Sequence, residues 1–548
     1  MSSRALWFAL PLGCFVAACA ADEPVADSPA PVEVARHDDA GLHKVKHVIV
    51  LMQENHSFDN YFGALTYAPG SPYHGPRGER SGDERGGDRD DGGNGDGSDP
   101  HGCPASDHAC VDGLRCAVDA AGGFHCANAN LDDDGSTVFA FHNTNRCVKP
   151  DLDHEWVSTH REANFDDPND TIRHAPMSGF VRVNDETEQH DGGIESATDD
   201  ETMGFYNQDE IPFYYGLANG FAISDRFFAS VLGPTFPNRS YLAAATSFGH
   251  LTTSDTFPPP GGYQPITGTI FDLLERNNVS WADYFQDAPQ GGAFRNFSAT
   301  AVDPHFFPLP VFLAQAADAP GVGDLPTVSF VDPNFGLAGI ARENDEHPPT
   351  DIQRGQAFVS QVVNAVRNGP HWEDSVIFIV YDEHGGAYDH VKPPRAAAPD
   401  AIAPGQCADL SNAPASLLPG GGAECNQNLF GDPRTSVADA ITLCPALAAD
   451  TTGPFPRECA GFDQLGVRVP FLAISPFSKR HYVSHEAADH TSILAFVERA
   501  FLTGHQHLTE RDGNANDLLD LFDFAHAPSL DAPVGQAAPP AVDCTPVH

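Results

Sequence analysis

Two segments far apart in the chain carry oxygen-bearing side chains directly after short apolar runs. Glu54 and Asn55 follow the first run, and Asp382 and Glu383 follow the second. Carboxylate and amide oxygens are the ligands that a hard divalent cation prefers. We therefore interpret these four residues as candidate ligands of one metal ion, assembled from distant parts of the sequence.

A local interpretation fits the same residues. Asn55 or Ser57 would then be the N-cap of a helix, because short polar side chains satisfy the first free N–H groups there. The second pair would belong to a turn, since Gly385 and Gly386 follow it. The two interpretations are compatible, because functional residues are often carried by turns at the ends of rigid elements.

The apolar runs at 48–52 and 376–380 are typical of strands buried on both faces of a parallel sheet. In open α/β sheets the ligand site lies beyond the carboxyl ends of such strands. Helical and strand patterns alternate in the rest of the chain, which favours a parallel sheet. We predict helices at 211–222, from 240, and at 269–277, 310–317, 352–368, 491–502 and 511–524, and strands at 221–228, 279–285, 328–331 and 467–474.

The charge balance limits the partners of the chain. Its 548 residues include 30 Lys and Arg against 76 Asp and Glu, a formal net charge of -46. Phosphate backbones and anionic lipid surfaces both attract cationic protein surfaces. The composition therefore argues against nucleic acid as a partner and against electrostatic adhesion to anionic lipid. The length allows one large domain or two medium ones.

The first residues have the pattern of an export signal. Arg4 precedes an apolar run at 5–18, which is too short for a spanning helix. The sequence VAAC at 16–19 resembles a lipobox, so residues 1–19 would be a signal segment and Cys19 the lipidated mature terminus. Ordinary cleavage after Ala20 also fits. We predict a disordered tether at 20–43 and an exported protein, either an outer-membrane or periplasmic lipoprotein or a secreted one.

Cysteine usage agrees with export. The chain has 12 Cys, of which ten lie beyond the signal segment. An even number in an exported chain suggests disulfides, although the sequence does not give their pairing. Five lie in a Gly- and Asp-rich insert, about 66–145, or just after it, and four in a second insert, about 397–460. The tail at 528–548 is Pro-rich, and Cys544 is a candidate tether for it.

Five ordered motifs carry a resemblance. They are ENHSFDNYFG at 54–63, GPTFPNR at 233–239, NDEHPPTDIQRGQ at 344–356, DEHGGAYDHV at 382–391 and GVRVPFLAISPF at 466–477. Together they resemble the phosphoesterase family of bacterial phosphatidylcholine-type phospholipases C and acid phosphatases, to which the plant non-specific phospholipases C also belong. The resemblance covers about 44–525 and implies one domain at 44–527, an alkaline-phosphatase-like three-layer α/β sandwich with a central, mainly parallel sheet.

The resemblance also implies roles for single residues. Thr235 would be the nucleophile, and a hydroxyl at a helix N-terminus suits that role because backbone N–H groups and the helix dipole stabilise a phosphoryl anion there. An ordinary N-cap is the alternative for Thr235. His347 and His154 would stabilise charge and assist the leaving group. The phosphate-binding candidates are Asn55, Arg239, His305 and His490, and the metal ligands are Glu54, Asn55, Thr235, Asp382 and Glu383.

Three hypotheses about function follow from the motifs and the composition. The first is a metal-dependent phospholipase C that cleaves phosphatidylcholine-like lipids to diacylglycerol and a phosphorylated headgroup through a phospho-threonine. The second is an acid phosphatase acting on phosphomonoesters. The third is a non-catalytic, calcium-binding surface lipoprotein, suggested by Asp-Gly loops and the large negative charge. In the enzyme the cation would be Ca²⁺, Zn²⁺, Mg²⁺ or Mn²⁺, and membrane contact would come from the anchor or the substrate.

Overall fold

The computed structural model describes residues 37, 39–76, 102–132, 135–148, 151–164, 176–190, 201–251, 253, 262–294, 303–337, 339, 342–400, 462–504, 506–530 and 544. The chain divides into units at 1–30 and 31–548, and everything described belongs to the second. The predicted signal segment, most of the tether, most of the second insert and most of the tail lie outside the described residues. Within the described part, no helix has the length and apolarity needed to cross a membrane.

The centre of the described chain is an eight-stranded sheet with the order β10-β9-β11-β1-β12-β13-β8-β14. Its strands are β1 (His47–Gln53), β8 (Ala222–Ser224), β9 (Trp281–Phe285), β10 (Phe306–Pro308), β11 (Val328–Val331), β12 (Ser375–Tyr381), β13 (Phe471–Ile474) and β14 (Val483–Ser484). Strand β13 is antiparallel to both neighbours, and the other pairs are parallel. The predicted mainly parallel sheet is confirmed.

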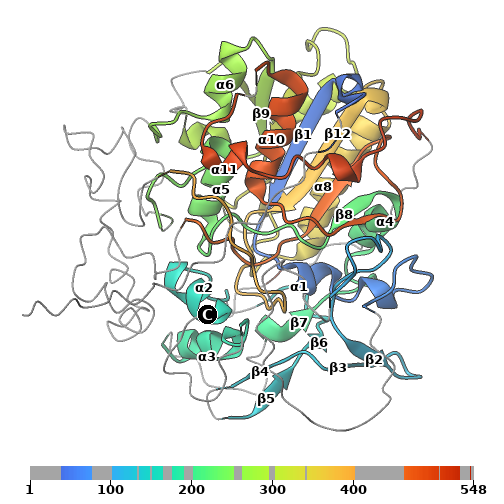
Figure 1. The fold of residues 1–548 in the computed structure, drawn as a ribbon, viewed down its shortest axis with the longest axis vertical. Helices are drawn as coiled ribbons and strands as arrows, with labels where there is room; N and C mark the ends of the chain where they lie inside the picture. The colour runs from blue at the N-terminus through green and yellow to red at the C-terminus, as the bar shows by residue number, and fades with distance from the viewer. Residues whose placement is uncertain are drawn as a thin grey trace, which may run out of the picture. The chain divides into compact units, whose positions relative to one another are not determined.

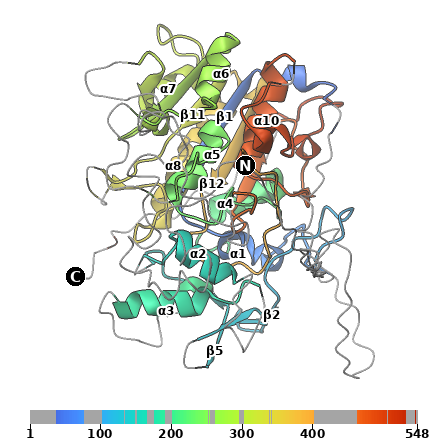
Figure 2. The same ribbon diagram turned by 60° about the vertical axis from the view of Figure 1, so that its left-hand side comes forward.

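Helices flank this sheet in two contacting groups (Figures 1 and 2). One group is α5 (Thr235–Ala244), α6 (Ile270–Arg276), α10 (His490–Phe501) and α11 (Glu510–Gly513), and the other is α4 (Pro212–Gly220), α7 (Leu309–Ala316) and α8 (Ile352–Arg367). Short 3-10 helices are η1 (Leu42–Lys44), η2 (Leu65–Tyr67), η3 (Glu201–Met203), η4 (Gln290–Ala293), η6 (Trp372–Asp374) and η7 (Leu519–Leu521). The predicted α/β class, a sheet between two helical layers, is confirmed.

Burial explains why the two central strands could be found in the sequence. Every residue of β12, and every residue of β1 after His47, is buried. A strand covered by helices on both faces needs an unbroken apolar run rather than an alternating one. The pairing of β1 with β12 runs from His47 opposite Ser375 to Gln53 opposite Tyr381. The polar residues that follow these two strands therefore lie side by side.

Some predicted boundaries are wrong. The helix expected from 240 begins at Thr235, one and a half turns earlier, and contains Pro237 in its first turn, where a proline needs no hydrogen-bond donor. The helix expected at 511–524 is only the four-residue α11 and the separate turn η7, because Leu518 adopts a left-handed backbone conformation with φ 57°. A helix cannot continue through such a residue.

Small elements gather beyond the carboxyl ends of β1 and β12 (Figures 1 and 2). They are α1 (Phe58–Phe62), α2 (Trp156–Ala163), α3 (Phe180–His190), β2 (Cys116–Val118), β3 (Phe124–Cys126), β4 (Ala129–Leu131), β5 (Thr137–Phe139), β6 (Phe141–His142) and β7 (Gly204–Phe205). Disulfides join Cys103 to Cys110, Cys116 to Cys126 and Cys147 to Cys544. The predicted disulfide-containing insert and the tether at Cys544 are confirmed.

Arg468 anchors the insert to the sheet from a fully buried position. Its Nε donates to Asp389 at 2.9 Å and its Nη2 to Asp59 at 3.1 Å. Its Nη1 donates to the backbone carbonyl of Asp112, in the insert, at 2.8 Å. The guanidinium also lies 4.5 Å from the ring centre of Phe58. One side chain thus links the approach to β13, helix α1 and the insert.

Replacement of Arg468 by Leu is expected to lower the free energy of unfolding by about 3–5 kcal/mol, because it removes the counter-ion of buried Asp389 and leaves buried Asp59 with His390 alone. Urea denaturation of the purified protein measures the change. Arg395→Leu is the matched control, since its partner Asp463 is 43% exposed and a surface pair contributes at most about 1 kcal/mol. Equal losses in the two variants would contradict the anchoring role.

Candidate active site

The two predicted pairs of metal ligands lie together where β1 and β12 end. The backbone N–H of Asn55 donates to the Asp382 carboxylate at 3.3 Å, and the backbone N–H of His56 donates to the Glu383 carbonyl at 3.2 Å. Asn55 has φ 64°, which turns the chain sharply after the strand. At Gly385 a Cβ would lie 2.4 Å from the Asn55 Cβ, so only glycine allows this close approach.

Arg239 binds one carboxylate from each pair. Its Nη2 lies 2.9 Å from Glu54 Oε1, and its Nε lies 2.9 Å from Asp382 Oδ2. Burial raises the pKa of Asp382, and the positive charge of Arg239 opposes that rise. The Nη1 group of Arg239 is buried and has no hydrogen-bond partner among the described residues. The guanidinium therefore neutralises the acids and keeps one donor group unused.

Thr235 begins helix α5 one turn before Arg239. Residues four apart lie on the same face of a helix, with side chains tilted toward its N-terminus. Thr235 therefore projects from the same face of α5 as Arg239, the residue that contacts Glu54 and Asp382. The N-cap of α5 is Pro234, so the alternative that Thr235 is an ordinary N-cap is wrong.

Two histidines face the acids from separate loops. His154 Nε2 lies 3.5 Å from Glu383 Oε1, and the ring centres of His154 and His347 are 5.9 Å apart. Burial lowers the pKa of His154, but the charges of Glu383 and Asp151 outweigh it and raise the value to about 9. For His347, burial is likewise outweighed by Asp151, then Glu54 and Asp345, and the pKa rises to about 10. Both rings are therefore cations near neutral pH.

The model of the Phosphoesterase family matches residues 45–503. The chain belongs to the Phosphoesterase family. Non-specific phospholipase C6 of Arabidopsis thaliana is 30% identical over 341 residues, which are 61% of this chain and 55% of that protein. Phospholipase C B of Mycobacterium tuberculosis is 28% identical over 544 residues, 92% of this chain and 84% of that protein. The alignments with non-specific phospholipases C6 and C1 of Arabidopsis thaliana cover 55% and 58% of those proteins.

Solved structures give a weaker comparison. Murine ectonucleotide pyrophosphatase/phosphodiesterase 5 matches 57% of this chain and 95% of its own, with 10% identity and a TM-score of 0.30. The lipoteichoic acid synthase LtaP of Listeria monocytogenes matches 56% of this chain and 69% of its own, with 12% identity and a TM-score of 0.28. The assignment to the Phosphoesterase family therefore rests on the sequence matches.

Glu346 makes contacts that its position beside His347 in the sequence does not predict. An acidic residue next to His347 in the sequence would favour the protonated form of that histidine. The Glu346 carboxylate instead accepts hydrogen bonds from the hydroxyls of Tyr61, Tyr214 and Tyr381 at 2.5–2.6 Å. Burial raises its pKa to about 7 against the effect of these donors. In this member of the Phosphoesterase family, the residue fixes the loop that carries His347.

The structure places the two predicted phosphate-binding histidines, His490 and His305, in different surroundings. His490 is fully buried, its Nε2 donates to the Tyr381 carbonyl at 2.9 Å, and its Nδ1 lies 3.1 Å from Ser230 Oγ. Burial lowers the pKa of His490 to about 4, so the ring is neutral and supports the end of β12. The ring of His305 stacks on the ring of Trp281, with ring centres 4.2 Å apart, at the amino end of β9. The structure does not bring His305 to the carboxyl edge of the sheet.

Several residues of this site were missed in the sequence. Asp151 stands three positions before His154, and its carboxylate lies 3.9 Å from His347 Nε2. The Asp345 carbonyl accepts the Glu54 N–H at 2.8 Å, and its carboxylate accepts the His347 N–H at 3.1 Å. The one signal for Asp151 in the sequence was that it lies close to His154. No local pattern shows that it also faces His347, which lies almost 200 residues away.

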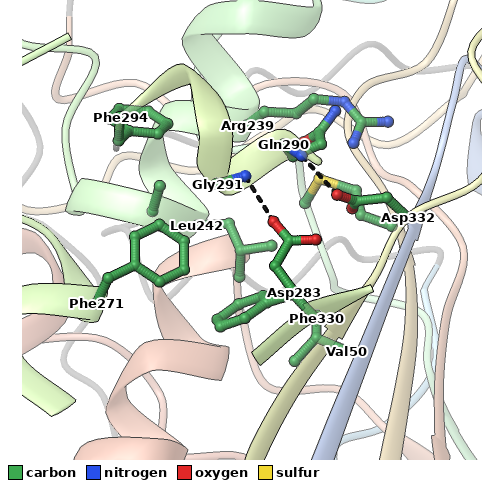
Figure 3. Close-up of a pocket in the computed structure, with 12 residues that line it drawn as sticks. Val50, Arg239, Leu242, Phe271, Asp283, Gln290, Gly291, Phe294, Phe330 and Asp332 are labelled. Carbon is green, nitrogen blue, oxygen red and sulfur yellow. Dashed lines mark hydrogen bonds between the residues drawn. The ribbon is translucent and has the colours of Figure 1, made fainter. Parts of the chain in front are cut away.

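A small, mostly apolar cavity lies behind Arg239, between α5, α6 and the sheet (Figure 3). Two carboxylates line it, and both accept backbone N–H groups: Asp283 from Gly291 at 2.8 Å and Asp332 from Gln290 at 2.5 Å. Burial raises the pKa of Asp332 to about 6 and that of Asp283 further. The cavity gives Arg239 an apolar and acidic surrounding.

Replacement of Glu346 by Gln is expected to change how stability depends on pH. The folded chain raises the pKa of Glu346 from 4.5 to about 7, so the folded state binds this proton more tightly than the unfolded state. The resulting stabilisation is complete below pH 4.5 and is lost as the pH rises through about 7. Its full size is roughly 3 kcal/mol.

Urea denaturation between pH 4 and pH 8 (roughly the range over which this group titrates) measures that contribution. Glu346→Gln should lose about 3 kcal/mol less than the wild type over this range. Some decline remains in the variant because the pKa values of Glu343 and Asp382 are also raised to about 7. Glu510→Gln, at an exposed position, should follow the wild type. Parallel curves for wild type and Glu346→Gln would show that Glu346 does not titrate as the structure indicates.

Proposed function

We propose that this chain is a metal-dependent phosphoric ester hydrolase that acts through a covalent phospho-threonine, and that it is a phospholipase C cleaving phosphatidylcholine-like lipids. The observation that carries the proposal is the meeting of two distant acid pairs at one sheet edge, joined by Arg239 one helical turn from Thr235. A buried cluster of acids beside a hydroxyl at a helix N-terminus is suited to phosphoryl transfer.

The residues present fit a hard divalent cation. Both polar side-chain atoms of Asn55 are buried and have no hydrogen-bond partner among the described residues, and Glu383 Oε1 has only its ion-pair contact with His154 at 3.5 Å. Unpaired buried oxygens are costly unless a ligand binds them. The residues that would hold the cation are Glu54, Asn55, Thr235, Asp382 and Glu383. When bound, such an ion supplies positive charge for a phosphoryl oxygen and lowers the pKa of a coordinated hydroxyl.

The side chains of this protein have definite tasks in the proposed reaction. Thr235 Oγ loses its proton to solvent and attacks phosphorus while the bond to the leaving alkoxide breaks. The alkoxide takes a proton from a cationic histidine, which then regains one from solvent. The backbone N–H of Thr235 and the unused Nη1 of Arg239 hold the phosphoryl oxygens. A water molecule then attacks phosphorus, releases the phosphorylated product and returns the proton to Thr235. His347 and His154 supply the positive charge that both steps need.

The comparisons support a lipid substrate. The relatives named above are phospholipases C, and the Mycobacterium protein aligns with 92% of this chain. Hydrolysis of a choline phosphodiester would release diacylglycerol and phosphocholine, whereas a phosphatase would release inorganic phosphate from a monoester. Three disulfides among the described residues support export. We propose an exported protein that meets its substrate at a membrane, with Cys19 as its lipid anchor.

The substrate prediction is tested with p-nitrophenylphosphorylcholine and p-nitrophenyl phosphate, each with and without a chelator. We expect turnover of the choline diester and loss of turnover after chelation. Turnover of the monoester alone would assign the protein to the acid phosphatases instead. Absence of both activities would favour a binding function, such as that of a calcium-binding lipoprotein.

The nucleophile is tested by Thr235→Ala, which should lower turnover of the diester by at least about 10³-fold, as for loss of a covalent nucleophile in other hydrolases. Thr503→Ala, at an exposed position, is the matched control and should keep wild-type turnover. Circular dichroism verifies that both variants fold. Wild-type turnover by folded Thr235→Ala would exclude the phospho-threonine.

A further inference from the structure

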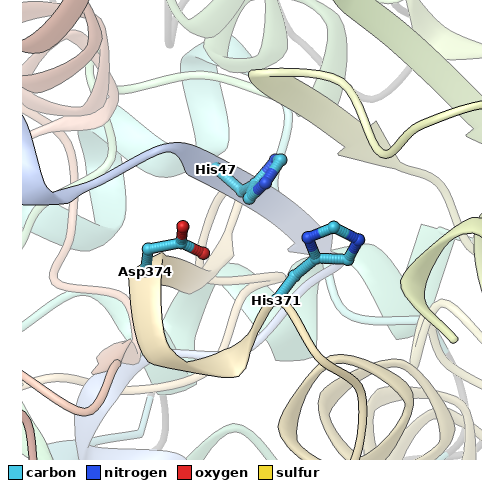
Figure 4. Close-up of side chains that lie close together, drawn as sticks. All are labelled: His47, His371 and Asp374. Carbon is cyan, nitrogen blue, oxygen red and sulfur yellow. The ribbon is translucent and has the colours of Figure 1, made fainter. Parts of the chain in front are cut away.

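A second group of metal-binding side chains lies at the opposite end of the same strand pair (Figure 4). His47 is the first residue of β1, and His371 and Asp374 immediately precede β12. Glu54 is seven residues further along β1, which places it about 23 Å away at a rise of about 3.3 Å per residue. The group is therefore separate from the candidate active site.

The three side chains converge. One ligand atom from each of them lies within 4.8 Å of the other two. The rings of His47 and His371 meet edge to face, with centroids 4.8 Å apart and an interplanar angle of 70°. Figure 4 shows both rings and the Asp374 carboxylate beside one shared space. Small rotations of these side chains would bring three ligand atoms to one ion.

Hydrogen bonding fixes the state of His47 that a metal requires. Its Nδ1 lies 2.9 Å from the carbonyl oxygen of Pro326, and because a carbonyl only accepts, Nδ1 carries the proton. The lone pair of Nε2 is left for a ligand. A histidine that coordinates a metal commonly donates its other N–H in this way, which sets the orientation of the ring.

His371 and Asp374 are held by a tight turn. They stand at the start and end of the turn containing η6, three residues apart, a spacing that aligns side chains in a 3-10 helix. The His371 carbonyl accepts from Ser375 Oγ at 2.6 Å, and the Asp374 carbonyl accepts from the Lys46 N–H at 2.8 Å. The Oδ1 atom of Asp374 is buried and has no hydrogen-bond partner among the described residues.

We propose that His47, His371 and Asp374 bind one Zn²⁺ ion, with water as the fourth ligand. Two imidazoles and one carboxylate are a typical zinc donor set, and zinc accepts them in tetrahedral geometry. This set differs from the oxygen-rich set of the candidate active site. The ion joins the start of β1 to the start of β12 and has no part in hydrolysis.

The experiment uses the full chain, freed of metal by chelation and titrated with Zn²⁺. The active-site double variant Glu54→Gln, Asp382→Asn removes two of the five proposed catalytic ligands and should still bind one Zn²⁺ per chain. Adding His371→Ala to it should weaken zinc binding by at least about 100-fold, more than the loss of an outer hydrogen-bond partner. Adding His43→Ala, an exposed histidine four residues before His47, should leave binding unchanged.

Spectroscopy provides the second readout. Co²⁺ or Cu²⁺ bound to the double variant should show coordination by two imidazole nitrogens, and this signal should disappear with His371→Ala or Asp374→Asn. Single His371→Ala should keep the hydrolase activity of the wild type. A double variant that binds no Zn²⁺, or equal losses with His371→Ala and His43→Ala, would overturn the proposal. The zinc-binding and spectroscopic results do not depend on whether the protein hydrolyses phospholipids.

Discussion

The parallel pairing of β1 with β12 is the constraint on which the candidate active site depends. The register brings Gln53 opposite Tyr381, so the next residues, Glu54 and Asp382, must emerge side by side. A shift by one residue would turn the buried side chains of one strand to the opposite face of the sheet. Because both strands are buried on both faces, the hydrophobic core fixes this register. Packing energy thus holds two acids together that would otherwise repel one another.

The repulsion among these acids explains the cations around them. Burial raises the pKa of Asp382 and of Asp345, so each carboxylate resists ionisation on its own. Arg239 comes from a helix, and His154 and His347 come from two separate loops, and each lies beside at least one acid. In the proposed reaction the same cations would face the phosphoryl group. The cations that offset the repulsion among the buried acids would therefore also attract an anionic substrate.

The sequence predicted the strands and their terminal acids because both signals are local. A doubly covered strand is an unbroken apolar run, and the run at 328–331 has the observed bounds of β11. The position of Arg239 between two acids, and the three tyrosines around Glu346, could not be predicted, since these contacts join residues 35–285 positions apart. The sequence around His305 does not reveal at which end of a strand that residue lies.

The two ends of the β1–β12 pair carry different chemistry for a physical reason. At the carboxyl ends the chain turns into loops and into α1, where acids gather beside the N-terminus of α5. At the amino ends the tight turn of η6 brings His371 and Asp374 next to His47, whose Nδ1 donates to the Pro326 carbonyl and leaves Nε2 for a ligand. Oxygen ligands suit a hard cation at the first end, and nitrogen ligands suit a softer one at the second. One pair of buried strands therefore positions both sets of ligands, because its register is fixed along its whole length.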